Sequence, residues 1–150
     1  MFAKSIYSTL TVIGALTLLI AAGSVRPGLA KSGGGQLEGT WAVTVSFDSP
    51  PPGFPDAFTA LETYSRGGGL ITSNNLPVPV VPKVGQGAWE KNGNQYSVAI
   101  LFFTFDENGV HNGSIHVRHR ITLEGKDAYS GEGEAEFRDV NGNPLFTLPF

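Results

Sequence analysis

The chain has 150 residues, of which 41% are hydrophobic and 15% are charged, so it can bury one ordinary core and leaves little room for a second domain. Its formal net charge is −3 and it lacks a basic run, which argues against a nucleic-acid partner. The absence of cysteine excludes disulfide bonds, thiolate metal sites and a cysteine nucleophile.

The N-terminal segment has the pattern of a cleaved signal peptide. Lys4 precedes an uncharged stretch over residues 5–25, and small residues before position 31 predict cleavage after Ala30, with Ala22 as the alternative. Loss of residues 1–30 would remove two cations and no acid, which takes the net charge from −3 to −5. This segment predicts a secreted or periplasmic protein that is not inserted in a membrane after cleavage. An uncleaved membrane anchor is the alternative, because about 20 uncharged residues can cross a bilayer.

The rest of the chain divides into a short linker and one domain of strands. The glycine-rich residues 31–36 predict a flexible linker, and residues 37–150 predict the folded domain. Residues 40–47 alternate between apolar and polar side chains, with Trp41 and Phe47 on the apolar face. This period of two predicts a half-buried strand at the start of the domain.

Proline and glycine separate the next segments. Residues 48–55 contain four prolines and predict a loop, because proline cannot donate to a strand ladder. Residues 58–64 and 70–73 predict the second and third strands, on either side of a glycine-rich turn. Residues 74–83, with three prolines between valines, predict an extended edge or a lid-like loop.

Asn-Gly steps in the second half predict three tight two-residue hairpins, each of which fixes a register. The steps are at residues 92–93, 108–109 and 141–142. A fourth step at residues 112–113 could compete for the second bend and would set Phe102 opposite Leu123, with the same side chains facing inward. The second step predicts the pairs Phe102 with Ile115, Ile100 with Val117, Val98 with His119, and Tyr96 with Ile121. The other two predict Trp89 opposite Tyr96, Phe137 opposite Phe146, and Ala135 opposite Leu148. All three hairpins then share one apolar inner face.

A turn near Gly125 should keep the same faces together. If the residue numbers of each pair across this turn add to an even total, Val117 and Ile121 lie on the same face as Tyr129 and the small glycines that follow it. On the opposite face it sets His116, Arg118 and Arg120 beside Glu132, Glu134 and Glu136. We interpret this charged ladder as a solvated outer wall, not as a site.

About eight short strands in meander order predict an all-β fold, a single antiparallel β-barrel that follows the signal peptide, with a closely related β-sandwich as the alternative. Closure would remove the free edges of the sheet. The interior of such a barrel is either filled by side chains or holds one small ligand.

The tripeptide Gly39-Thr40-Trp41 at the start of the first strand resembles the glycine-any-tryptophan signature of lipocalins and the wider calycin barrels. This resemblance implies an eight-stranded cup that binds a small hydrophobic molecule. In outline the chain is also similar to the allene-oxide-cyclase-like barrels. That similarity implies isomerase or cyclase chemistry in the same kind of cavity, so an enzyme stays the second reading.

Two polar residues are expected on the inner face. His119 lies there by the register above, and Glu62 shares a face with Phe58, Ala60 and Tyr64 if that apolar set is buried. They could form a general acid and base or fix the polar end of a ligand. Alternatively, His119 bonds a neighbour near the barrel end and Glu62 faces solvent. The expected ligand-binding residues are Tyr64, Trp89, Tyr96, Val98, Ile100, Val117 and His119.

No cofactor and no metal site are expected. His111 lies next to a turn, while His116 and His119 have opposite parity, so the three histidines cannot readily share a metal. The predicted register also turns Leu101, Phe103 and Phe105 outward as an apolar strip. We expect residues 74–83 or a second copy of the chain to cover this strip, the latter making a homo-oligomer.

The sequence therefore predicts an exported β-barrel that binds a small hydrophobic molecule. A cyclase or isomerase in the same cavity is the first alternative. A structural or interaction domain with a packed core is the second. The volume of the cavity separates the ligand-holding readings from the packed one.

Overall fold

The computed structural model describes residues 37–77 and 82–150. The predicted signal peptide and linker, residues 1–30 and 31–36, lie outside the described residues. Within the described part, no helix is long and apolar enough to cross a membrane.

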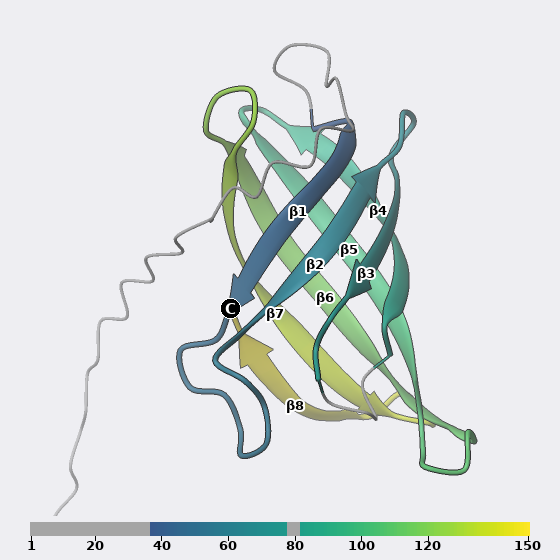
Figure 1. The fold of residues 1–150 in the computed structure, drawn as a ribbon. Helices are drawn as coiled ribbons and strands as arrows, with labels where there is room; N and C mark the ends of the chain where they lie inside the picture. The colour runs from purple at the N-terminus through teal and green to yellow at the C-terminus, as the bar shows by residue number, and fades with distance from the viewer. Residues whose placement is uncertain (1–36, 78–81) are drawn as a thin grey trace, which may run out of the picture.

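Eight antiparallel strands follow one another in chain order, and each pairs with the next to form one curled sheet (Figure 1). They are β1 (Gly39–Ser46), β2 (Ala57–Tyr64), β3 (Gly69–Asn74), β4 (Val84–Asn92), β5 (Gln95–Phe105), β6 (His111–Leu123), β7 (Tyr129–Asp139) and β8 (Pro144–Pro149). The meander of eight strands is confirmed, and their bounds follow the alternation of apolar and polar residues.

In the described residues the sheet is a curled half-barrel with two edges, β1 and β8, and this all-β antiparallel form is compatible with the predicted barrel. β8 pairs only with the second half of β7, from Glu134 to Arg138. Opposite the first half of β7 lies β1, where the rings of Trp41 and Tyr129 meet at 5.1 Å between centroids. No strand ladder joins β1 and β7 in the described part of the chain, and we call the gap between them, which the Trp41–Tyr129 contact bridges, the seam.

Most of the predicted register is confirmed. The pairs observed as expected are Phe102 with Ile115, Ile100 with Val117, Val98 with His119, Tyr96 with Ile121, Phe137 with Phe146, and Ala135 with Leu148. The residue sum across the β6–β7 turn is even, as in the pair Val117 with Ala135. One apolar inner face therefore runs through β5, β6, β7 and β8.

The β4–β5 register is shifted by two residues from the prediction. Trp89 pairs with Val98, and not with Tyr96, because the turn is made by Gly93 and Asn94. Gly93 has φ of 64°, while no residue other than glycine has a positive φ in the described part. A turn with a positive φ only at its first central residue places glycine there. A shift of two residues keeps each side chain on its predicted face, so the Trp89 ring still packs on Tyr96, with 5.7 Å between the ring centroids.

The other two Asn-Gly loops are longer than the predicted two-residue turns. Each begins with an aspartate, Asp106 or Asp139, whose side chain accepts backbone N–H bonds from residues two and four positions later. A β-bulge follows in each hairpin, between Thr104 and Phe105 and between Phe137 and Arg138. The bulge absorbs the extra residue, so the register beyond it is the predicted one.

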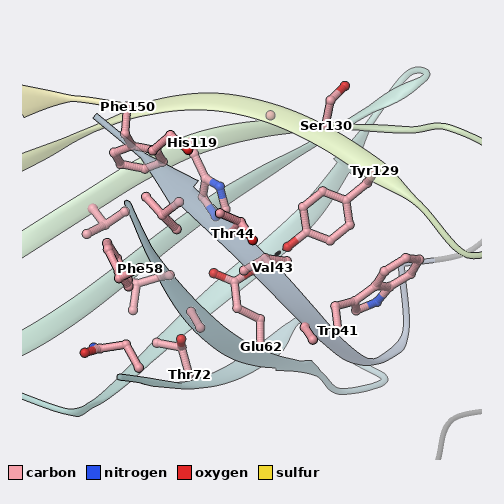
Figure 2. Close-up of a pocket in the computed structure, with 18 of the residues that line it drawn as sticks. Trp41, Val43, Thr44, Phe58, Glu62, Thr72, His119, Tyr129, Ser130 and Phe150 are labelled. Atoms are coloured by element: carbon pink, nitrogen blue, oxygen red, sulfur yellow. Dashed lines mark hydrogen bonds between the residues drawn. The ribbon is translucent and has the colours of Figure 1, made fainter. Parts of the chain in front are cut away.

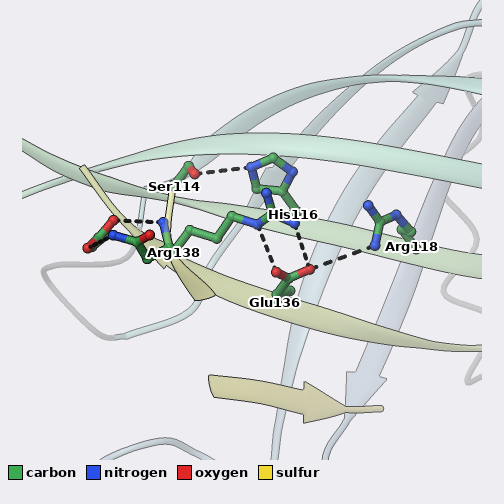
Figure 3. Close-up of polar contacts among 7 residues, drawn as sticks. Ser114, His116, Arg118, Glu136 and Arg138 are labelled. Carbon is green, nitrogen blue, oxygen red and sulfur yellow. Dashed lines mark hydrogen bonds and ion pairs between the residues drawn. The ribbon is translucent and has the colours of Figure 1, made fainter. Parts of the chain in front are cut away.

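The outer wall carries the charged ladder that the sequence predicts. Glu136 accepts hydrogen bonds from Arg138, with the Nε–Oε1 distance 2.8 Å, and lies 3.8 Å from an Arg118 nitrogen (Figure 3). The hydrogen bonds from Arg138 lower the pKa of Glu136. Since this wall is solvated, we attribute little stability to these ion pairs.

The apolar outer strip is exposed in the structure. Leu101, Phe103 and Phe105 are 38%, 56% and 44% exposed. In the described part of residues 74–83, Leu76 packs into the core against Ile115 and does not cover the strip. Coverage by a second copy of the chain stays a prediction.

Candidate ligand cavity

A cavity of about 140 Å³ lies inside the half-barrel and reaches the seam. Residues 41–47 of β1 and the loop after it all border it, so both faces of this edge strand contribute. Across the seam it is bordered by residues 127–131, at the start of β7. Figure 2 shows Glu62, His119 and Tyr129 around the same space, with Trp41 and Phe58 along its sides.

β2 carries Glu62 into this interior. Alternation along the strand buries Ala60, Glu62 and Tyr64 and turns Leu61 outward, where it is 47% exposed. Glu62 is itself only 5% exposed. The predicted inward set of β2 is therefore confirmed, and a carboxylate is held among apolar side chains.

Two tyrosine hydroxyls bind the Glu62 carboxylate. Tyr64 and Tyr129 both donate to its Oε2, with 2.8 Å between Tyr129 Oη and Oε2. Burial raises the pKa of Tyr64 and of Tyr129 above 10, and the charge of Glu62 raises both further. Both hydroxyls therefore keep their protons and act as donors, which provides the carboxylate with neutral partners.

His119 brings a second polar group to the cavity from β6. Its Nε2 is buried and has no hydrogen-bond partner among the residues that the structure describes. Burial lowers the pKa of His119 below its usual 6.5, and the charge of Glu62 opposes that shift. The imidazole is therefore neutral at pH 7, where Nε2 can either accept or donate one hydrogen bond according to its tautomer.

The cavity gathers some of the predicted site residues and not others. Glu62, His119, Ile100 and Val117 line it. The remaining expected ligand-binding residues, which are Tyr64, Trp89, Tyr96 and Val98, pack in the hydrophobic cluster beside it. Tyr64 still acts on the cavity, through its bond to Glu62.

Three further residues belong to the site without having been assigned to it from the sequence. Tyr129 was expected on the inner face, but its bond to Glu62 joins residues 67 positions apart. Trp41, which the sequence places on the apolar face of the first strand, both lines the cavity and donates from Nε1 to the Leu37 carbonyl at 2.8 Å. Thr72 lines the cavity from β3 and is buried, a placement that only its alternation with Ile71 could have indicated.

No family model matches this sequence, and neither a curated protein nor a solved structure matches it significantly. Within residues 37–77 and 82–150, no group of three metal-ligating side chains could hold an ion. The cavity offers one buried carboxylate, two hydroxyl donors to it and one imidazole nitrogen that has no partner among the described residues.

Proposed function

We propose that the protein holds one small, largely apolar molecule in this cavity, with the polar end of the molecule at Glu62 and His119. The observation that carries the proposal is His119, which lines this cavity and whose buried Nε2 has no hydrogen-bond partner among the described residues. A buried polar atom that lacks a hydrogen bond costs free energy, about 1–3 kcal/mol. A ligand that bonds Nε2 would recover that cost.

The size of the cavity supports a small ligand. Its volume of about 140 Å³ is close to that of an engineered protein cavity, about 150 Å³, that stays dry and binds benzene. The resemblance of Gly39-Thr40-Trp41 to the lipocalin signature supports the same role, because calycin barrels hold small hydrophobic molecules. A purely structural domain would more simply have a filled interior.

We further propose that the protein acts outside the cytoplasm, after removal of residues 1–30. Native mass spectrometry of protein isolated from its own cell envelope or medium tests both proposals in one spectrum. We expect a mature chain that begins at Lys31 and an added mass from one bound small molecule. A chain that retains residues 1–30 would contradict the proposed removal of this segment.

A pair of alanine substitutions tests the cavity itself. Ala60→Leu places three extra carbons in the cavity, whereas Ala88→Leu makes the same change on the exposed outer side of β4. We expect toluene to bind the wild-type protein and Ala88→Leu alike in NMR titrations, and to bind Ala60→Leu at least tenfold more weakly. Absence of toluene binding to the wild-type protein, together with no co-purified molecule, would overturn the proposed function.

A further inference from the structure

We infer that the ligand carries a protonated amine beside its apolar body, and that the amine lies against Glu62. This inference rests on the proposed function and names the chemical class of the molecule. It starts from the hydrogen bonds of the carboxylate. Both tyrosine hydroxyls donate to Oε2, and no donor from the described part of the chain reaches Oε1.

The charges around the cavity favour a cation. Its lining residues include two acids, Glu62 and Asp127, and no lysine or arginine. Asp127 belongs to the β6–β7 turn, beside the seam, where a negative charge attracts cations toward the opening. An anionic ligand would meet repulsion at both positions.

A buried carboxylate with only neutral donors is incompletely compensated. Its burial is costly unless an opposite charge or several hydrogen bonds replace water. A hydroxyl on the ligand would add one neutral bond to Glu62. An ammonium group adds a charge as well as donors, and hydrogen bonds between charged partners are the stronger ones.

The aromatic side chains near Glu62 also suit an ammonium group. Trp41 pairs with Glu62 across β1 and β2, and its ring lies 5.1 Å from the ring of Tyr129, whose hydroxyl bonds Glu62. An aromatic ring attracts a cation that lies over its face, so two rings near the carboxylate favour a cationic ligand.

A matched series of benzyl compounds tests the inference on the full-length protein. We would titrate benzylamine, benzyl alcohol, benzoate and toluene at pH 7 and follow the backbone NMR signals. We expect benzylamine to bind at least tenfold more tightly than benzyl alcohol, and benzoate to bind most weakly of the four. Benzyl alcohol or benzoate binding as tightly as benzylamine would overturn the amine assignment, while toluene binding would leave the proposed function standing.

Substitution of the carboxylate locates the effect. In Glu62→Gln we expect the preference for benzylamine over benzyl alcohol to fall at least tenfold, with toluene binding retained. Glu134→Gln makes the same change of charge on the outer wall and should keep the wild-type preference. An unchanged preference in a folded Glu62→Gln protein would overturn the inference. If that variant does not fold, the wild-type ranking of the four probes decides.

Discussion

The imidazole of His119 makes the folded protein sensitive to acid. Its pKa lies below the usual 6.5 because the ring is buried. As the pH falls through 6.5, the unfolded chain takes up a proton at this position before the folded chain does. The free energy of unfolding therefore falls with decreasing pH, and this loss ends only when the folded ring is protonated as well.

We expect His119→Gln to remove that loss. Between pH 7 and pH 5, the free energy of unfolding should decline less steeply in this variant, by up to about 1.4 kcal/mol per pH unit. Urea titrations at several pH values measure both slopes. His116→Gln, on the outer wall, is the matched loss of a histidine outside the cavity. Equal slopes in the wild-type protein and His119→Gln would contradict the burial of Nε2.

At the scale of single residues, the sequence predicts which way a side chain points better than which residue it bonds. The register of β5 with β6 turns His119 inward, and alternation in β2 turns Glu62 inward once the larger apolar set of that strand is taken as the buried one. The bond from Tyr129 to Glu62 depends on how far the sheet curls, which no local pattern sets. Trp89 and Tyr96 pack in the hydrophobic cluster and do not line this cavity.

Among the strands, β6 and β7 approach closely where Gly133 pairs with His119. A Cβ on Gly133 would lie 2.5 Å from the carbonyl oxygen of Arg118, and closer still to the Cβ of His119. Gly133 also exchanges two backbone hydrogen bonds with Phe150, at 2.9 and 3.0 Å. The lack of a side chain at Gly133 thus lets β7 lie close to β6 at His119, while its backbone bonds Phe150.

We expect Gly133→Ala to separate these strands and move His119. Because the added methyl meets backbone atoms, the variant should be about 1–3 kcal/mol less stable to urea, the usual cost of overpacking. The imidazole NMR signals of His119 should shift at the same time. Gly69→Ala is the control, since a Cβ there meets its nearest atom at an ordinary 3.9 Å. A Gly133→Ala protein as stable as Gly69→Ala would contradict this close approach.

The strands show why the register was predictable while the turns were not. Alternation fixes which residues face inward, so the parity of each hairpin survives an error in its turn. In the β4–β5 hairpin the error was the choice of turn type. Of the two turn residues, Gly93 and Asn94, only Gly93 has a positive φ. At Asp106 and Asp139 the aspartate side chain builds a longer loop, and a bulge restores the expected pairs.

At the scale of the whole molecule, the sequence does not determine whether the first and last strands pair to close the barrel. Pairing of β1 with β8 would join the two ends of the meander, a contact that alternation and turn residues do not encode. β8 pairs with only the second half of β7. The first half of β7 has β1 across the seam, where the rings of Trp41 and Tyr129 meet. The cavity reaches this seam, so the ligand that we propose would enter the half-barrel there.

Hydrogen exchange should reveal the seam in solution. Amides in the centre of β5 and β6, which have a strand on both sides, should exchange only on global unfolding. In β1, amides alternate between bonding β2 and facing the seam, so every second amide should exchange orders of magnitude faster. NMR-detected exchange at pH 7 measures these rates residue by residue. Uniform protection along β1 would mean that the strand pairs across the seam in solution, and that the ligand must reach the cavity by another route.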